Sequence, residues 1–272
     1  MITSTKNEQI KNITSLIKKA RERKAQRLFV IEGIRAVAEV PGQLLHAIYY
    51  VEGFTDSAEG QAFISDIHAK APNAPIEEVA KTVFNSMSDT VTPQGVLALV
   101  KMQEFTLEDV VGATAGRVPH VMILESLQDP GNMGTIVRTA EGAGATGIIM
   151  NNTTVDIYSP KVVRSTMGSI FRVPHIVVKD LSATIEQLKN DYRISVYAAH
   201  LKGEKYYDEF DLTSPTAFMI GNEGNGLTDE ISNCASSYLK IPMEGKLESL
   251  NASVAASLLM YETHRQRKNS GV

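Results

Sequence analysis

The second half of the chain alternates short apolar runs with helical patterns, and this alternation restricts the fold more than any other feature of the sequence. The apolar runs include VMILE, GIIM, HIVV, ISVYAA and AFMI, and most of them lead into a segment of helical periodicity. Strands that are connected through helices lie parallel in one sheet, and helices cover both faces of that sheet. The pattern predicts an α/β domain with a mostly parallel sheet, in which ligands bind beyond the carboxyl ends of the strands.

A second, smaller alternating pattern precedes it. Residues 7–26 have helical periodicity, with Ile10, Ile13, Leu16 and Ile17 on one face. Further strands are predicted at residues 28–31, AIYYV and GVLALV, and further helices at residues 33–40, 58–70 and 81–88. The pattern indicates a small α/β domain at the N-terminus.

The boundary between the two patterns is a mixed segment, QEFTLEDVVGATAGRVP, without sustained periodicity. We therefore predict an N-terminal domain over residues 1–102, a linker over residues 103–118 and a second domain over residues 119–272.

Composition excludes several classes of protein. A single cysteine, Cys234, excludes an internal disulfide and a thiolate-rich metal site, and the six histidines lack metal-ligand spacing. No apolar stretch reaches the ~18 residues of a membrane span, and the N-terminus lacks the apolar core of a signal peptide. We expect a cytoplasmic protein with no membrane partner and no metal.

The charge is unevenly distributed. The whole chain carries a net charge of −4, but its first 30 residues hold eight Lys and Arg residues against Glu8 and Glu22, a net charge of +6. The rest of the chain therefore sums to −10. Such a basic run is either a solvated helix face, which is the commoner meaning, or a surface for nucleic acid.

Three predicted loops at strand ends have unusual chemistry. The first, QDPGNMG, precedes a helix that carries Arg138. Asp129, Pro130 and Gly131 are typical of a tight turn with a helix cap, which is one interpretation of this loop. Asn132 and Arg138 favour the other interpretation, a functional loop, because they place polar groups close to the crevice at the strand ends.

The second and third loops are GNEGNG and IPMEGKLESLN. The glycines of the second let backbone pass close to a ligand, and Glu223 disfavours phosphate and suits a cationic or hydroxyl-rich ligand, although a surface turn is the alternative. In the third loop, Ser249 and Asn251 are both good helix caps, so one of them is spare.

One motif matches a cofactor-binding pattern but stands in the wrong structural context. Residues 142–147, GAGATG, match the dinucleotide-binding pattern G-x-G-x-x-G, but that pattern should follow a strand and open a helix. These glycines end a predicted helix and precede a predicted strand. The context disfavours nucleotide-dependent hydride transfer.

At the three loops the sequence resembles the SpoU/TrmH family of S-adenosylmethionine-dependent RNA ribose 2′-O-methyltransferases. DPGNMGTIVRTAEGAGA, FMIGNEGNGL and IPMEGKLESLNASVAAS resemble its three motifs, in that order over residues 129–257, and YSPKVVRSTMGSIFRVP is also similar to the family. VIEGIRAVAEV and VFNSMSDTVTPQGVLALV are similar to the small N-terminal RNA-binding domain of many members. Glu125 departs from the family, since it stands where aspartate is common.

The resemblance implies a trefoil-knotted α/β methyltransferase domain that binds S-adenosylmethionine, works without a metal and forms a homodimer. The donor-binding residues that it implies are Gly221, Ile241, Met243, Ser249 and Leu250. The catalytic residues that it implies are Asn132, Arg138, Glu223 and Asn251. Guanidinium is a poor general base, so we expect Arg138 to stabilise the developing 2′-oxyanion or to hold the adjacent phosphate.

The resemblance also implies an RNA substrate, with ribosomal RNA favoured over transfer RNA, and shifts the basic run towards RNA binding. The residues expected to contact RNA are Lys18, Lys19, Arg21, Arg23 and Arg164. Arg164 could instead serve the dimer interface. A non-catalytic RNA-binding or assembly factor that keeps the fold is the alternative class of function, and the intact set of four catalytic positions counts against it.

Overall fold

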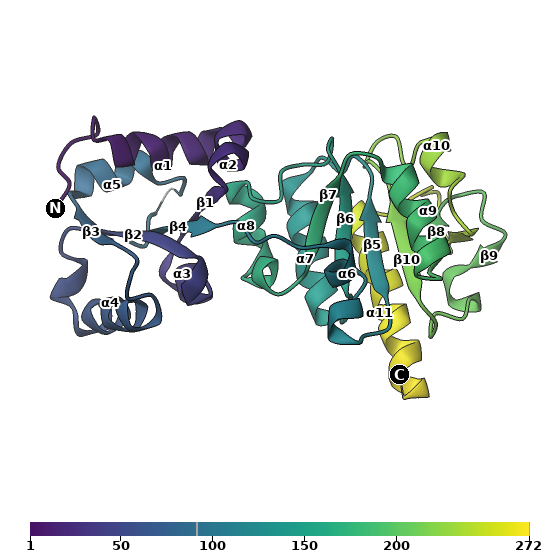
Figure 1. Ribbon diagram of the computed structural model, residues 1–272. Helices are drawn as coiled ribbons and strands as arrows, with labels where there is room; N and C mark the ends of the chain where they lie inside the picture. Colours follow the sequence, from purple (N-terminus) through teal and green to yellow (C-terminus); the bar gives the residue numbers. More distant parts are fainter. Residues whose placement is uncertain (91, 272) are drawn as a thin grey trace. The chain divides into compact units, whose positions relative to one another are not determined.

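The structure is a computed structural model that describes residues 1–90 and 92–271 (Figure 1). Its chain divides into two compact units. The first unit comprises Met1–Gln103 and Asp156–Phe171, and the second comprises Glu104–Val155 and Arg172–Val272. The first unit therefore incorporates a segment that lies within the second half of the sequence. No helix in the described part of the chain is both long and apolar enough to cross a membrane.

The first unit contains a mixed four-stranded sheet. Its strands, in spatial order, are β1 (Leu28–Glu32), β4 (Val96–Lys101), β2 (Leu45–Val51) and β3 (Ile76–Val79). Strand β4 is antiparallel to β1 and β2, whereas β2 and β3 are parallel. Three of these strands are predicted by the sequence. Strand β3 is missed because it is short and reads IEEV, with two charged residues in four.

One face of this sheet is covered by α1 (Glu8–Lys18) and α5 (Lys81–Met87), whose apolar side chains join its core. The sequence predicts one helix over residues 7–26, but the chain is extended at Lys19 (φ −125°, ψ 111°) and continues as α2 (Ala20–Gln26). The break leaves carbonyl groups at the end of α1 without helical donors. The Arg23 guanidinium donates to two of them, the carbonyls of Leu16 (2.6 Å) and Ile17 (3.1 Å).

The opposite face of β1 receives the segment Asp156–Phe171. Phe29 alternates with the residues that face α1, and its ring lies 4.8 Å from that of Tyr158 and 6.3 Å from that of Phe171. A second anchor is the buried ion pair between Arg23 and Asp156, whose Nη2 and Oδ2 atoms are 2.6 Å apart. Apolar packing and a buried charge pair therefore hold this segment to the first unit.

The second unit contains seven strands, all of whose pairings are parallel. In spatial order they are β7 (His175–Val178), β6 (Gly147–Asn151), β5 (His120–Leu124), β10 (Thr216–Ile220), β8 (Ser195–Ala199), β11 (Ser237–Lys240) and β9 (Lys205–Tyr206). The predicted parallel α/β architecture is confirmed. The two-residue strand β9 is too short to give a sequence signal.

Helices cover both faces of this sheet, and α9 and α11 lie on opposite sides of it in Figure 1. The helices on the α9 side are α6 (Leu107–Val110), α9 (Leu181–Asp191) and α10 (Asp229–Ser232), and those on the other side are α7 (Pro130–Gly142) and α11 (Ala252–Ser270). Val121 and Ile123 of β5 point into the first layer. Met122 and Leu124, which alternate with them, point towards the second. The knot that the resemblance implies stays a prediction.

The remaining helices are α3 (Ile34–Ala38), α4 (Ala58–Lys70) and α8 (Pro160–Thr166), with short 3-10 turns at Gly42–Leu44, Phe54–Asp56, Ala113–Ala115, Ser169–Phe171 and Tyr207–Glu209. Helix α6 and the turn Ala113–Ala115 lie within the segment that the sequence predicts to be a linker. Val110 and Val111 of that segment are buried in the core of the second unit. The division of the chain into residues 1–102, 103–118 and 119–272 stays a prediction.

The glycines of the motif at residues 142–147 have a packing role. Gly142 ends α7 and Gly147 begins β6, as the sequence context predicts. A Cβ atom on Gly147 would lie 2.7 Å from the Cα atom of Val110. The position therefore requires glycine because α6 approaches β6 closely.

Candidate functional site

A cavity of about 650 Å³ lies at the carboxyl edge of the sheet in the second unit. The ends of β8, β10 and β11 form its floor, and the loops that follow β10 and β11 form its walls. Seven residues that the sequence analysis selects line it: Gly221, Glu223, Ile241, Met243, Ser249, Leu250 and Asn251. The fold brings these residues together from two loops that are separate in the sequence.

The glycine loop, residues 221–226 after β10, is closed by two backbone hydrogen bonds. The backbone N–H of Asn222 donates to the carbonyl of Gly226 (3.0 Å), and the N–H of Gly226 donates back to Asn222 (2.8 Å). A Cβ atom on Gly221 would lie 2.1 Å from the carbonyl carbon of Gly226, so no other residue fits this position. Gly226 has φ +69°, in the left-handed region that favours glycine. The loop itself therefore requires glycine at Gly221 and Gly226.

Glu223 joins this loop to the start of α7. Its Oε2 accepts from the N–H of Gln128 (3.0 Å), and its Oε1 accepts from the N–H of Asp129 (2.9 Å) and from Asn132 Nδ2 (3.0 Å). Burial by itself raises the pKa of Glu223, but the hydrogen bond from Asn132 and those from the two backbone N–H groups outweigh it and lower the pKa. The carboxylate is thus held ionised and engaged by the first loop.

The first loop is a capped helix start, as one of its two interpretations predicts. Asp129 accepts from the N–H of Asn132 (2.8 Å), and Pro130 is the first residue of α7. The structure also supports the other interpretation for Asn132, whose side chain is only 7% exposed and is bonded to Glu223. Asn132 therefore acts on the cavity through Glu223.

Arg138 is placed differently. It is exposed on α7, is not among the residues that line the cavity, and makes no hydrogen bond or ion pair with any residue that the structure describes. The structure does not bring Arg138 into contact with Asn132, Glu223 or Asn251. Its guanidinium is presented to solvent.

The choice of helix cap in the third loop is settled by the structure. Asn251 caps α11, since its Oδ1 accepts from the N–H of Ser253 (2.9 Å), the hydroxyl of Ser253 (2.7 Å) and the N–H of Val254 (3.3 Å). Ser249 is the spare candidate, and its exposed side chain lines the cavity.

Glu125 binds Thr228, which lies just after the glycine loop. It follows β5, is 6% exposed, and accepts from the N–H (2.9 Å) and the hydroxyl (2.7 Å) of Thr228. Thr228 in turn caps α10. A glutamate here is therefore a structural residue with both carboxylate oxygens occupied.

The sequence does not predict several of the residues that line the cavity. They include His200 and Leu201 after β8, together with Lys240 and Glu248. The His200 ring stacks on Tyr238, with centroids 5.0 Å apart and planes 23° apart. The available signal was the end of the ISVYAA strand, because the carboxyl ends of neighbouring parallel strands share one edge.

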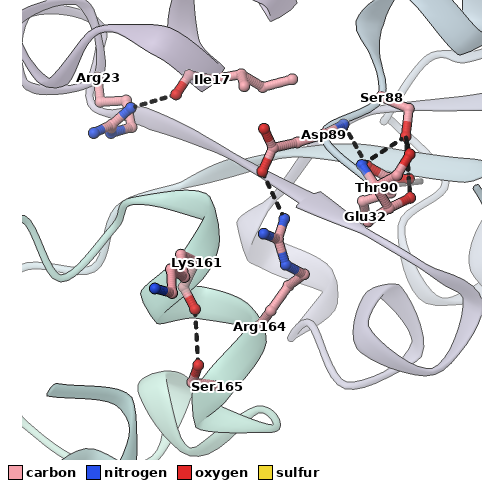
Figure 2. Close-up of polar contacts among 9 residues, drawn as sticks. All are labelled: Ile17, Arg23, Glu32, Ser88, Asp89, Thr90, Lys161, Arg164 and Ser165. Carbon is pink, nitrogen blue, oxygen red and sulfur yellow. Dashed lines mark hydrogen bonds and ion pairs between the residues drawn. The ribbon is translucent and has the colours of Figure 1, made fainter. Parts of the chain in front are cut away.

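The basic positions in the first unit have different environments. Lys18, Lys19 and Arg21 are exposed, as an RNA-contacting role requires. Arg23 is 4% exposed and is occupied by Asp156 and by the carbonyls of α1, so its guanidinium is not presented to a ligand. Its inclusion among the RNA contacts is corrected: a charge cluster in the sequence does not reveal which member turns inwards. Arg164 lies on α8 and bonds to Asp89 (Figure 2).

Within residues 1–90 and 92–271, no three His, Cys, Asp or Glu side chains form a group that could hold a metal ion.

Two family models match the chain. Residues 119–261 match the SpoU rRNA Methylase family, and residues 7–98 match the MRM3-like substrate binding domain. The chain is 32% identical over 263 residues to the 23S rRNA (guanosine(2553)-2'-O)-methyltransferase RlmP of Bacillus subtilis, covering 96% of this chain and 97% of that protein.

Two solved structures are similar over almost the whole chain. One is an RNA 2'-O ribose methyltransferase, 30% identical, with a TM-score of 0.77 and coverage of 98% of this chain and 99% of that one. The other is the SpoU methyltransferase AviRb from Streptomyces viridochromogenes in complex with the cofactor AdoMet, 25% identical, with a TM-score of 0.83 and coverage of 97% and 100%.

Proposed function

The chain belongs to the SpoU rRNA Methylase family, and from this we propose that it transfers the methyl group of S-adenosylmethionine to a ribose 2′-hydroxyl of RNA. Ribosomal RNA is the favoured substrate, because the similar Bacillus subtilis protein is named for 23S rRNA. The observation that carries the proposal is the cavity at the carboxyl ends of the strands. The loops GNEGNG and IPMEGKLESLN, which resemble the second and third family motifs, both line it.

The cavity fits the methyl donor. Its volume of about 650 Å³ lies within the range of about 300–1,000 Å³ that is typical of small-molecule sites. Leu201, Leu227, Ile241 and Met243 offer apolar surface for an adenine ring, and the backbone of the two loops offers polar groups. The donor supplies an already activated methyl group on a sulfonium. The residues that would hold it are Gly221, Ile241, Met243, Ser249 and Leu250.

The protein's share of the chemistry is positioning and control of charge, since the donor needs no further activation. Glu223 and Asn132 fix the distance between the glycine loop and the start of α7, and Asn251 fixes the start of α11. Arg138 has no protein partner among the described residues, which leaves all its donors free for RNA. We assign to it the developing 2′-oxyanion or the adjacent phosphate.

The first experiment is transfer of labelled methyl from S-adenosylmethionine to undermodified ribosomal RNA and, separately, to transfer RNA. Native protein is compared with Asn132→Ala and Arg138→Ala, and the product RNA is hydrolysed with alkali. Because a 2′-O-methyl group removes the internal nucleophile, label in alkali-resistant dinucleotides identifies the reaction. Label from native protein only supports the proposal, and the RNA that carries it separates the ribosomal substrate from the transfer RNA alternative.

Equilibrium dialysis with labelled S-adenosylmethionine tests the alternative function, that of a non-catalytic RNA-binding or assembly factor. A chain that binds RNA but no methyl donor would be a non-catalytic RNA-binding factor. Arg138→Lys tests the guanidinium specifically, since lysine keeps the charge and loses the planar fork. Near-normal turnover of this variant would refute the assigned role.

We also propose that the protein is a cytoplasmic homodimer. Helix α11 exposes Val254 (46%), Leu258 (36%) and Tyr261 (50%), which are spaced on one face. They line an open groove of about 490 Å³ together with Thr135 of α7. Exposed apolar surface of this kind marks interfaces. Light scattering should give twice the mass of the chain, and Leu258→Glu should give the monomer mass.

A further inference from the structure

Arg164 lies on the surface of the first unit with most of its donors unused. It is exposed on α8, and its Nη1 donates to Asp89 Oδ2 at 2.8 Å (Figure 2). No other hydrogen bond of this guanidinium to a described residue is present in the structure. A guanidinium has five N–H donors, and its fork matches the two oxygens of a phosphate better than one carboxylate oxygen.

Asp89 is held in place by a separate set of contacts. Glu32, at the end of β1, accepts from the hydroxyl of Ser88 (2.6 Å), the hydroxyl of Thr90 and the backbone N–H of Asp89 (3.1 Å). One carboxylate thus binds three consecutive residues, as Figure 2 shows. The loop is fixed by Glu32, so the Asp89 carboxylate would keep its place if Arg164 moved away.

The Arg164–Asp89 pair is not needed to hold α8 in place. The pair of Arg23 and Asp156 joins the same two segments with side chains that are only 5% and 16% exposed. Those of Arg164 and Asp89 are 38% and 42% exposed. A solvent-exposed ion pair contributes about 0–1 kcal/mol, so exchanging Asp89 for another anion has little cost.

Other exposed cations border the same place. Lys161 lies one turn before Arg164 on α8, and its side chain has no hydrogen bond or ion pair to the described residues. Ile17, at the end of α1, lines a small cavity with Val163 and Arg164, and the exposed Lys18 follows it. That cavity has a volume of about 20 Å³, which cannot hold a nucleotide. A ligand must therefore lie on the surface.

We propose that Arg164 binds a phosphate of the RNA backbone, and that Asp89 occupies this guanidinium when RNA is absent. The inference rests on the proposed function for the class of ligand. Asp89 is then an intramolecular competitor that weakens binding of any RNA. An RNA that makes enough other contacts displaces it, whereas an RNA that makes few does not.

The test is the affinity of the full chain for a fluorescein-labelled RNA hairpin of mixed sequence, measured by fluorescence anisotropy from 50 to 200 mM salt. Arg164→Gln should weaken binding and reduce the slope of log K against log salt by about 0.7–0.9, the value for one phosphate contact. Asp89→Asn should tighten binding by up to about fivefold, the equivalent of the lost ion pair. The matched control is Asp66→Asn, which removes an exposed carboxylate from α4 and should leave the affinity unchanged.

The double variant decides the mechanism. If Asp89 acts through Arg164, Asp89→Asn has no effect in the Arg164→Gln background. An equal gain in both backgrounds would show a general charge effect and overturn the proposal, as would an unchanged salt slope for Arg164→Gln. A lower thermal midpoint with unchanged RNA affinity would also overturn it, since the pair would then be structural. Methyl transfer by the native chain tests the proposed function separately, so the two failures are distinguishable.

Discussion

The buried ion pair of Arg23 and Asp156 should carry a large part of the stability of the first unit. Arg23 makes two hydrogen bonds to Asp156 Oδ2, at 2.8 and 2.6 Å, and two to carbonyls at the end of α1. Removing one partner of a buried pair costs about 3–5 kcal/mol, because the other charge is left uncompensated. In Asp156→Asn the amide oxygen can still accept one hydrogen bond, so we expect the lower end, about 3 kcal/mol.

Native-state hydrogen exchange read by peptide mass measures this loss and assigns it to a unit. Peptides from α1 and β1 should lose protection in Asp156→Asn, and the thermal midpoint of the first unit should fall by roughly 10 °C. The control is Glu8→Gln, because the pair of Glu8 and Lys11 is 87% and 54% exposed and should matter little. A loss below about 1 kcal/mol in Asp156→Asn would refute the argument that burial makes this pair strong.

Three further outcomes are expected. Gly221→Ala should abolish donor binding in equilibrium dialysis, since its Cβ would lie 2.1 Å from Gly226; affinity within threefold of native would contradict the close approach. Glu223→Gln removes the negative charge that accepts three N–H groups and should weaken donor binding about tenfold, with Glu223→Ala weaker still and overall unfolding little changed. Burial lowers the pKa of His120 to about 3 and that of His175 to about 4, so both stay neutral in the fold but protonate in the unfolded chain below pH 6.5. The free energy of unfolding should therefore not depend on these two groups above pH 6.5. Below pH 6.5 each histidine should lower it by up to about 1.4 kcal/mol per pH unit. Urea titrations between pH 6.5 and 4 should show a smaller slope for His120→Phe than for the native chain.

Much of the local structure follows from the sequence, because periodicity and caps are properties of neighbouring residues. Asp129 and Pro130 predict the start of α7, and the glycines of residues 142–147 are correctly placed between a helix and a strand. The strands that the sequence does not predict, β3 and β9, have few apolar residues to show a period. The break at Lys19 was missed because Arg23 satisfies the freed carbonyls from outside the helix.

The site is predictable in part. The motif loops identify Gly221, Ser249 and Asn251 as residues of one cavity, since loops at the carboxyl ends of parallel strands share an edge. The partner of Glu223 is not predictable in the same way. Asn132 lies 91 residues away, and its hydrogen bond to Glu223 depends on the order in which β5 and β10 pair.

The two alternating patterns, the parallel sheet and the loops that carry the motifs all follow from the order of the residues, because they depend on local spacing and on which residue types can be buried. The folded chain, in contrast, sets which charged side chains are buried in ion pairs and which remain exposed to a ligand. Arg23 and Arg164 are both basic residues that bind an aspartate, yet one is buried against Asp156 and the other is open to solvent beside Asp89. The physical reason is that the strength of an ion pair depends on its exclusion from water, and that is set by segments far apart in the chain.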